Sequence, residues 1–292
     1  MTERPFEGII IASVRRSGRS APEQWTKERD DRMTQDQSMP VGVMDSGLGG
    51  VGTLAELTRV CPHERFVFLG DTLHAPYGVQ PREQICRHVE DAVASLARTG
   101  IKALVIACNT ATAAAAEKLR SMYAFPIIGM TPAVAEAAEA AEKGEVLVMA
   151  TPSTIASEAY ARLAAPYGDR VIGLPCPGLM EFAEQEIWDG PALNARLSGL
   201  LQGVDLSRVG AVVLGCTHYV FLREAIGRFL APGTPVLDAN RRAADALRRT
   251  LEENGMAADE TRKGETVFMT TGGAQDTARM QRVFERLLMN RL

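Results

Sequence analysis

The chain has 292 residues, of which 46% are hydrophobic, 23% are charged and 5% are aromatic. This composition is typical of a globular protein of one or two domains that can bury a large core. The formal net charge of −4 gives no general reason to expect a nucleic acid or an anionic membrane as a partner. No apolar run approaches the roughly eighteen residues that cross a bilayer, which excludes a membrane-spanning helix.

We do not expect the apolar run near the start of the chain to be a secretion signal. The apolar run at 8–12 is too short for the core of a signal peptide, and acidic residues precede it. We therefore expect a cytoplasmic protein whose five cysteines stay reduced. None of these cysteines stands at a Cys-x-x-Cys or Cys/His metal spacing, so no metal site is expected.

Residues 1–38 differ from the rest of the chain. The segment 15–38 is almost wholly polar and carries charges of both signs. We interpret 1–38 as a flexible N-terminal extension that contributes little to the core. The alternative is a regulatory arm that folds against the body of the protein, anchored by Trp25.

From residue 39 onward, apolar runs alternate with segments of helical periodicity. Strands are predicted at 40–44, 65–69, 102–107, 125–129, 145–150, 170–174, 211–214, 234–237 and 266–271, mostly with helices between them. Continuous apolar strands joined by helices indicate parallel sheets covered on both faces. We therefore predict an α/β protein with two doubly wound parallel-sheet domains, since two smaller sheets are commoner at this length than one large sheet.

Ligands of such sheets bind beyond the carboxyl ends of the strands. Candidate site residues should therefore come from the loops that follow the predicted strands. These loops lie at 45–50, 70–78, 108–112, 151–154 and 215–218.

Two cysteines occupy matching settings. Cys108 and Cys216 each follow a predicted strand and precede a helix-like segment, at 113–119 and 219–230 respectively. A helix N-terminus favours the thiolate over the thiol, so both are candidate reactive thiols. Polar residues that can donate to a thiolate follow them: Asn109, Thr110, Thr217 and His218. The other cysteines lack this setting and are interpreted as core residues: Cys61, Cys86 and Cys176.

Asp45 opens the glycine-rich turn 45–50. This turn has neither the lysine of a P-loop nor the GxGxxG spacing, and an acidic residue opposes phosphate binding. We interpret Asp45 as a carboxylate that binds an ammonium group or handles a proton. His218 can hydrogen-bond a thiolate or relay a proton, although a lone histidine is more often structural. The hydroxyls at 151–154 can hold a carboxylate.

Two kinds of chemistry fit these residues. A Cys-His hydrolase explains one cysteine and the histidine, but it leaves the second cysteine without a role. Two opposed thiols explain both cysteines, because one thiolate removes a proton from a carbon and the other thiol returns a proton to the opposite face. The result is racemisation or epimerisation without a cofactor.

Four motifs together resemble the glutamate racemase family, in the family's order from about residue 39 to the end of the chain. They lie at 43–50 (Val-Met-Asp-Ser-Gly-Leu-Gly-Gly), 70–78 (Gly-Asp-Thr, then Pro-Tyr-Gly), 107–112 (Ala-Cys-Asn-Thr-Ala-Thr) and 214–219 (Leu-Gly-Cys-Thr-His-Tyr). The resemblance implies a cofactor-independent interconversion of L- and D-glutamate that supplies D-glutamate for peptidoglycan. It also implies two domains, at 39–132 plus 241–292 and at 133–240, with the site in the cleft between them.

The resemblance also implies roles for individual residues. Cys108 would act on D-glutamate and Cys216 on L-glutamate. The implied proton-handling neighbours are Asp45, His218 and Glu184. The implied substrate contacts are Asp45, Ser46, Pro76, Tyr77, Gly78, Asn109, Thr110, Thr151, Thr217 and His218.

Other functions stay open on the sequence. One is a racemase for aspartate or a hydantoin, since that wider group shares the paired-cysteine cleft. Another is an interaction protein, because some members of the family bind DNA gyrase. The arginine pairs at 241–242 and 248–249 could serve such a partner, although a solvated helix face is the simpler explanation.

The resemblance also bears on partners. Some bacterial members with N-terminal extensions are activated by UDP-N-acetylmuramoyl-L-alanine, which makes this precursor a candidate activator. We expect glutamate as the small-molecule substrate and a homodimer as the assembly. We expect no nucleic-acid and no membrane partner.

Overall fold

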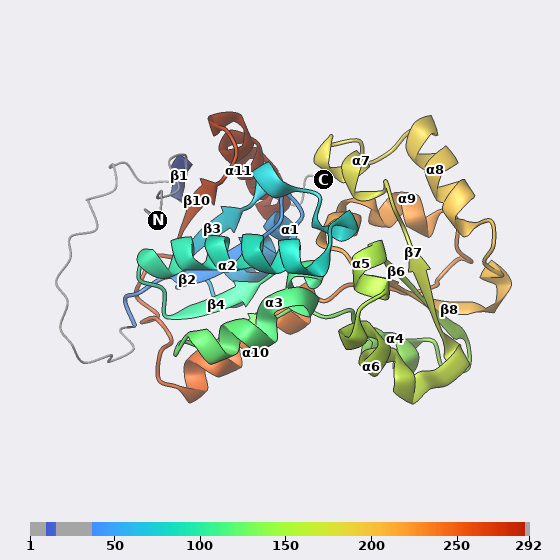
Figure 1. The fold of residues 1–292 in the computed structure, drawn as a ribbon, viewed down its shortest axis with the longest axis horizontal. Helices are drawn as coiled ribbons and strands as arrows, with labels where there is room; N and C mark the ends of the chain where they lie inside the picture. Colours follow the sequence, from blue (N-terminus) through green and yellow to red (C-terminus); the bar gives the residue numbers. More distant parts are fainter. Residues whose placement is uncertain (1–9, 16–36, 290–292) are drawn as a thin grey trace.

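The computed structural model describes residues 10–15 and 37–289, which form two sheets with their covering helices (Figure 1). The first sheet has six strands in the order β1-β10-β3-β2-β4-β5. These strands are β1 (Ile10–Arg15), β2 (Val41–Asp45), β3 (Arg65–Gly70), β4 (Ala103–Ile106), β5 (Ile127–Gly129) and β10 (Glu265–Thr270). Neighbours are parallel, except that β1 runs antiparallel to β10. Phe268 of β10 pairs with Phe68 of β3, so the C-terminal part of the chain completes this sheet.

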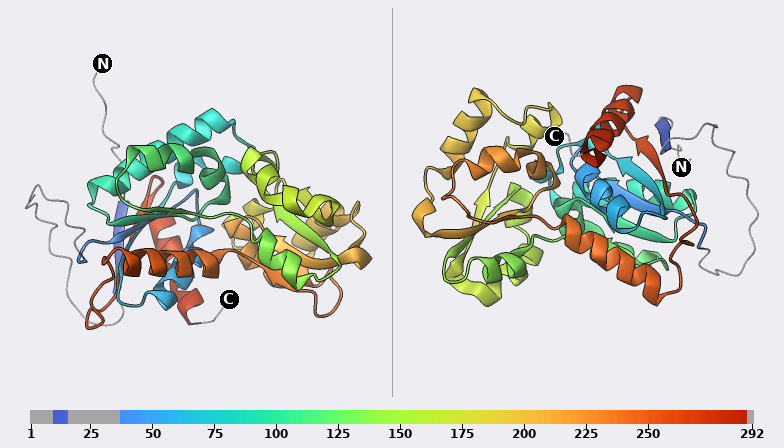
Figure 2. Two further views of the ribbon diagram at one scale, coloured as in Figure 1. Left: turned by 90° about the horizontal axis from the view of Figure 1, so that it is seen from below. Right: turned by 180° about the vertical axis from the view of Figure 1, so that it is seen from behind.

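Helices cover both faces of the first sheet (Figure 2). They are α1 (Gly50–Val60), α2 (Arg82–Arg98), α3 (Asn109–Met122), α10 (Asn240–Glu253) and α11 (Ala274–Leu288). Val43 of β2 packs in the cluster that includes α1, α10 and α11, and the next residue, Met44, packs in the cluster of α2 and α3. Successive strand residues face opposite sides, so both faces must be apolar, which explains the unbroken apolar runs in the sequence.

The second sheet has four parallel strands in the order β7-β6-β8-β9. The strands are β6 (Glu145–Ala150), β7 (Val171–Pro175), β8 (Val209–Leu214) and β9 (Val236–Leu237). Its helices are α4 (Val134–Ala140), α5 (Pro152–Ile155), α6 (Glu158–Ala164), α7 (Met180–Glu184), α8 (Pro191–Leu201) and α9 (Arg223–Gly227).

Short 3₁₀ helices complete the structure. They are η1 (Thr72–His74), η2 (Tyr77–Val79), η3 (Ala165–Arg170), η4 (Leu206–Arg208) and η5 (Thr217–Leu222). Within the described ranges, no helix has the length and apolarity that crossing a membrane requires.

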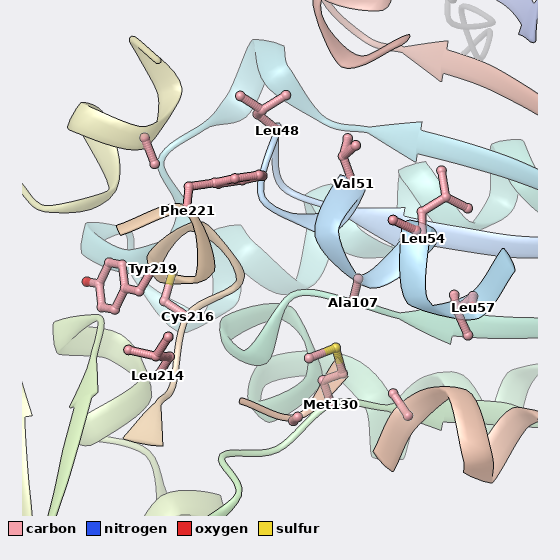
Figure 3. Close-up of a cluster of buried hydrophobic side chains, with 14 of the residues drawn as sticks. Leu48, Val51, Leu54, Leu57, Ala107, Met130, Leu214, Cys216, Tyr219 and Phe221 are labelled. Carbon is pink, nitrogen blue, oxygen red and sulfur yellow. The ribbon is translucent and has the colours of Figure 1, made fainter. Parts of the chain in front are cut away.

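The hydrophobic core continues from one sheet to the other (Figure 3). Leu48 and Leu54, from the α1 side of the first sheet, belong to the same buried cluster as Leu214, Tyr219 and Phe221 from the end of β8 and from η5. Because burial of apolar surface is the main favourable term in folding, this shared cluster stabilises the two halves against each other.

The predicted α/β architecture with two sheets is confirmed. Each of the nine predicted strands is present, with ends within two residues of the prediction. Strand β1 lies inside the segment interpreted as a flexible extension, where no strand was expected. The rest of that segment, 1–9 and 16–36 with Trp25, lies outside the described residues. The predicted domain boundaries near 133 and 241 stay a prediction.

Candidate active site

A small pocket lies where the carboxyl ends of the two sheets face each other. Its walls come from the loops after β2, β4, β6 and β8, together with η2 and α7. The lining residues are Ser46, Tyr77, Gly78, Cys108, Asn109, Thr110, Thr151, Met180, Cys216, Thr217 and His218. Ten of these eleven residues belong to the predicted site, so the structure brings together loops that the sequence could only propose one by one.

Cys108 follows β4 and is the N-cap of α3. Its Sγ accepts a hydrogen bond from the Ala111 backbone N–H at 3.4 Å, and Ser46 Oγ donates to it at 3.6 Å. Burial, followed by the Asp45 carboxylate, nevertheless raises the pKa of Cys108 to about 12. The helix N-terminus therefore favours the thiolate as expected, through the Ala111 N–H, but burial and Asp45 outweigh this effect.

Cys216 follows β8 but does not begin an α-helix. The segment predicted as one helix is the 3₁₀ turn η5 followed by the short α9, and Cys216 Sγ accepts no capping hydrogen bond. The tight turn directs the next two side chains into the site. Thr217 Oγ1 donates to Asp45 Oδ1 at 3.2 Å, and His218 Nδ1 lies 3.7 Å from Cys216 Sγ.

His218 is buried between a thiol and a carboxylate. Its Nε2 lies 2.7 Å from Glu184 Oε1. Burial opposes the charged imidazole, but the contacts with Cys216 and Glu184 outweigh it and hold the pKa of His218 well above its ordinary value. Burial also opposes the charged form of Glu184, but three groups outweigh it and lower the pKa of Glu184 to about 2: His218, the Leu48 N–H and Arg279. The two shifts therefore both favour an imidazolium that faces a carboxylate.

Asp45 ends β2 and lies behind the pocket lining, fully buried. Its Oδ2 accepts a hydrogen bond from the Gly47 N–H at 3.0 Å. Burial raises the pKa of Asp45, and His218 and the backbone N–H groups of Gly47 and Gly50 offset this only in part. A cationic group beside Asp45 would therefore stabilise the charged form of this carboxyl.

Hydroxyl groups from both sheets meet on one wall of the pocket. Thr110 Oγ1, at the start of α3, lies 2.9 Å from Thr151 Oγ1 and 3.1 Å from Thr154 Oγ1. Thr151 is also the N-cap of α5, where it accepts from the Thr154 N–H at 3.3 Å. The buried Oδ1 of Asn109 has no hydrogen-bond partner among the described residues. This wall therefore offers donors and one free acceptor to a polar ligand.

Tyr77 and Gly78 of η2 also line the pocket, and Gly78 packs against Thr151. The Tyr77 hydroxyl donates to Asp71, and burial together with that carboxylate raises the pKa of Tyr77 far above its ordinary value, so the phenol stays protonated. A Cβ at Gly78 would lie 2.6 Å from Thr151 Cβ, so only glycine permits this close approach of the two halves. Pro76 precedes this turn through a cis peptide bond and is not part of the lining.

Asp71, His74 and His88 are the group of possible metal ligands found within the described ranges, with ligand atoms within 4.8 Å of one another. The two imidazole rings are stacked, with centroids 3.9 Å apart and planes at 14°. Lone pairs of stacked rings lie in separate parallel planes and do not converge on one ion. His74 Nδ1 is already 2.8 Å from Asp71 Oδ1. Asp71 therefore supports the Tyr77 loop through hydrogen bonds with His74 and Tyr77, and His88 stacks on both rings.

The pocket is nearly closed, with a free volume of about 10 Å³. That is the space of about one water molecule. A ligand the size of an amino acid therefore enters only after the walls of the pocket move apart.

Two residues of this site were not predicted. Met180 lines the pocket from α7, but an apolar residue gives no signal in the sequence that separates it from the core. Arg279 of α11 reaches Glu184 Oε2 at 2.8 Å, although 95 residues separate them in the chain. An arginine on an amphipathic helix indicates a solvated face unless its partner is known.

The chain is similar to known proteins over most of its length. The model of the Asp/Glu/Hydantoin racemase family matches residues 52–247. Glutamate racemase of Clostridium novyi (strain NT) is 41% identical over 229 residues, covering 77% of this chain and 88% of that protein.

Solved structures show the same similarity. Glutamate racemase from Thermus thermophilus, in complex with β-chloro-D-alanine, has a TM-score of 0.73 and 35% identity, covering 86% of this chain and 94% of its own. Escherichia coli glutamate racemase, in complex with L-glutamate and the activator UDP-MurNAc-Ala, has a TM-score of 0.71 and 25% identity. The similarity covers 85% of this chain and 95% of the Escherichia coli chain.

Proposed function

This chain belongs to the Asp/Glu/hydantoin racemase family, and we propose that it interconverts L- and D-glutamate without a cofactor. The observation that carries the proposal is that Cys108 and Cys216, from the carboxyl ends of two different sheets, line one pocket. Racemisation needs a base on one face of a carbon and an acid on the other, and two thiols supply both. Relatives that are glutamate racemases favour glutamate as the substrate.

In the proposed reaction, the Cys216 thiolate removes the α-proton of L-glutamate. The C–H bond breaks, an S–H bond forms, and the electron pair stays on the α-carbon and its carboxylate. The Cys108 thiol then delivers its proton to the opposite face and becomes a thiolate. In the reverse direction Cys108 is the base and Cys216 the acid, so the proton count balances without a redox step.

His218 and Glu184 are the proposed proton-handling partners of Cys216. The imidazolium lies 3.7 Å from Cys216 Sγ, where a positive charge stabilises the thiolate. Glu184 keeps the imidazole in place from its other nitrogen, at 2.7 Å. This arrangement prepares Cys216 to act first on L-glutamate.

Asp45 is the proposed partner of the substrate ammonium group and of Cys108. An ammonium group about 4 Å from the thiol, at an effective dielectric constant of about 20, would stabilise the thiolate by about 4 kcal/mol, or about a thousandfold. This would offset much of the burial that raises the pKa of Cys108 to about 12. Substrate binding therefore helps to create the base that acts on the substrate.

The other predicted contact residues are proposed to hold the two carboxylates of glutamate through hydroxyl, amide and backbone groups. They are Ser46, Pro76, Tyr77, Gly78, Asn109, Thr110, Thr151 and Thr217. With Asp45 and His218 they form the complete proposed substrate contact set.

The test is exchange of the glutamate α-proton with solvent deuterium, measured by NMR on metal-free protein without pyridoxal phosphate. Cys108→Ala and Cys216→Ala should each lower racemisation by about a thousandfold or more, because each removes one of the two proton-transfer groups. Cys86→Ala, whose Sγ contacts the Ala114 carbonyl outside the pocket, is the matched control and should keep the wild-type rate. Racemisation that survives both active-site substitutions would refute the two-thiol mechanism.

Aspartate and a 5-substituted hydantoin are the alternative substrates. They are measured beside glutamate by circular dichroism on the same protein. A larger kcat/KM for either of them would replace glutamate as the proposed substrate.

We further propose that the D-glutamate serves peptidoglycan synthesis in the cytoplasm, that the protein is a homodimer, and that UDP-N-acetylmuramoyl-L-alanine activates it. The similar Escherichia coli structure contains that type of activator. Rates with and without the precursor test the activation. Sedimentation at several protein concentrations tests the dimer.

A further inference from the structure

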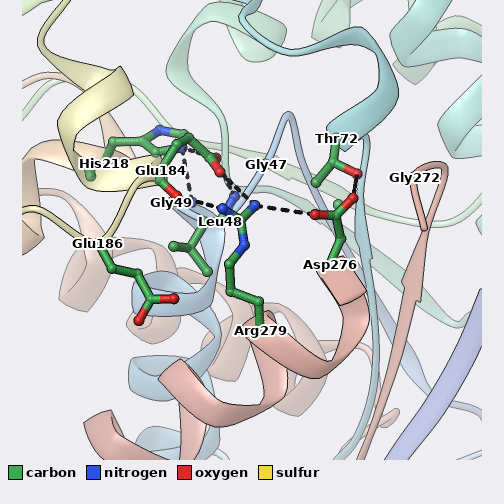
Figure 4. A network of polar contacts seen from close by, with 12 residues as sticks. Gly47, Leu48, Gly49, Thr72, Glu184, Glu186, His218, Gly272, Asp276 and Arg279 are labelled. Carbon is green, nitrogen blue, oxygen red and sulfur yellow. Dashed lines mark hydrogen bonds and ion pairs between the residues drawn. The ribbon is translucent and has the colours of Figure 1, made fainter. Parts of the chain in front are cut away.

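A chain of polar contacts runs from helix α11 to His218 (Figure 4), whose other ring nitrogen lies 3.7 Å from Cys216 Sγ. Arg279 Nη2 lies 2.8 Å from Glu184 Oε2, and Glu184 Oε1 lies 2.7 Å from His218 Nε2. Arg279 also donates to the backbone carbonyl of Glu184 through Nη1. The guanidinium of Arg279 therefore contacts both the side-chain carboxylate and the backbone carbonyl of Glu184.

The two carboxylate oxygens of Glu184 have different partners. Oε1 accepts from the Leu48 N–H at 2.7 Å and faces His218, whereas Oε2 faces Arg279. Without Arg279, Oε2 would lose this charge-assisted contact, and the carboxylate could rotate away from the imidazole. The side chains of Glu184 and His218 are only 17% and 2% exposed, so water would replace the lost contact poorly.

Arg279 is itself held from the first sheet. Asp276, one turn earlier on α11, lies 3.5 Å from Arg279 Nη2 through Oδ1. The other oxygen of Asp276 accepts from Thr72 Oγ1 at 2.9 Å and from the Gly273 N–H at 3.3 Å. A planar guanidinium between two carboxylates has a defined orientation, which suits it to orient Glu184.

We propose that Arg279 is a positioning residue for racemisation, which holds Glu184 against His218 and so sets the proton-transfer step at Cys216. The inference rests on the proposed glutamate racemisation. Arg279 belongs to α11 of the first sheet and Glu184 to α7 of the second. The contact therefore forms only when the two halves are together. The position of Glu184 and His218 beside Cys216 then depends on closure of the pocket.

The test compares Arg279→Met with Arg282→Met. Arg282 lies one turn further on α11 and pairs with Glu186, so its loss also removes an ion pair between the two halves but leaves Glu184 untouched. R279M should lower kcat/KM by about 10- to 100-fold, the usual loss when an orienting partner is removed. The loss must be equal in both directions, because the equilibrium constant of a racemisation is one. R282M should stay within about twofold of wild type.

Isotope effects show which proton transfer is slowed. With the Cys216 step impaired, substrate deuterated at the α-carbon should give a larger isotope effect on kcat/KM from L-glutamate and a smaller one from D-glutamate. R279K, which keeps the charge and one donor, should lie between R279M and wild type. Wild-type isotope effects in R279M, or the same change in R282M, would overturn the proposal. If R279M does not fold, the isotope effects of R279K test the proposal in its place.

A second readout needs no turnover. The proton between His218 Nε2 and Glu184 should give a downfield NMR signal that is lost or exchange-broadened in R279M and kept in R282M. Failure of the proposed function would appear as wild-type protein that does not racemise glutamate. Failure of the positioning role would appear as an unchanged signal in R279M.

Discussion

At the scale of single residues, burial and a few direct contacts decide which groups of the site carry charge. Burial raises the pKa of Cys108 to about 12, although the same burial is outweighed at Glu184, whose pKa is lowered to about 2. The difference is in the partners. Cys108 faces a carboxylate, whereas Glu184 faces an imidazolium, a guanidinium and a backbone N–H. The site therefore combines an ion pair with a thiol whose charged form is disfavoured.

The depressed pKa of Glu184 predicts a pH dependence of stability. Its charged form contributes stability above its ordinary value of 4.5, and this stability is lost as pH falls toward about 2. The full shift corresponds to up to about 3 kcal/mol. Denaturant titrations across this pH range should show a smaller decrease in the free energy of unfolding for Glu184→Gln than for wild type. The control is Asp189→Asn, at an exposed ion pair, whose free energy of unfolding should decrease as much as that of wild type. An equal decrease in Glu184→Gln would contradict the assignment of this pH dependence to Glu184.

At the scale of elements, turns with little space bring the site residues together. The β2–α1 turn passes directly over η5, where a Cβ at Gly49 would lie 2.6 Å from His218 Nδ1. The backbone of Gly49 is helical, with φ −55° and ψ −40°, so glycine is needed here for space and not for conformation. In η5, the 3₁₀ geometry replaces the predicted α-helix and directs both Thr217 and His218 into the pocket.

This predicts opposite outcomes for two alanine substitutions in the same segment. Gly49→Ala should lower kcat/KM by about tenfold or more, because His218 must move away from Cys216. Gly52→Ala is the matched control, since its nearest atom, Asn240 Nδ2, is 3.7 Å away. It should keep activity and raise the free energy of unfolding by up to about 1 kcal/mol, because alanine favours the helix. Kinetics and thermal melts of both variants check this, and wild-type kinetics in Gly49→Ala would disprove the steric argument.

At the scale of the whole molecule, the C-terminal segment closes the first sheet and is tied to it by a buried ion pair. Lys102 Nζ lies 2.6 Å from Glu64 Oε2, with side-chain exposures of 0% and 4%. Lys102 also donates to the Met256 carbonyl at 2.7 Å, and Glu64 Oε1 accepts from the Ala258 N–H at 2.7 Å. These contacts join the loop before β3, the start of β4 and the segment before β10.

Removing one charge of this pair should be costly. Lys102→Met leaves Glu64 buried without its partner and should lower the free energy of unfolding by about 3–5 kcal/mol. A double variant, Lys102→Met with Glu64→Met, should recover part of that loss because no buried charge remains. Denaturant unfolding of both variants measures this. A loss below about 1 kcal/mol in Lys102→Met would show that the pair contributes little.

Three of the four arginines considered as a partner-binding surface form ion pairs within the chain. Arg242 Nη1 contacts Glu136 Oε1 at 2.9 Å, which joins α10 of the first sheet to α4 of the second. Arg241 pairs with Asp245 at 2.9 Å and Arg248 with Glu252 at 3.1 Å on the same helix. A helix face that is already paired in this way needs no partner to explain its charge.

The amino-acid sequence by itself determined the strands and the residues at their carboxyl ends. Alternation of apolar runs and helical periods is a local property, readable from near neighbours, and it placed Cys108 and Cys216 at strand ends. The motifs around them were specific enough to indicate the family. Glu184, which only the resemblance to the family indicated, has its Oε1 2.7 Å from His218 Nε2.

Only the tertiary structure decided which strand ends meet and how their charges balance. Arg279 reaches Glu184 because α11 packs on the first sheet beside the cleft, and no local pattern encodes a contact over 95 residues. The high pKa of Cys108 likewise depends on burial by distant segments, which outweighs the local effect of a helix N-terminus. Local periodicity follows from steric and hydrogen-bonding rules along the chain, whereas burial and long-range electrostatics exist only once the chain has folded.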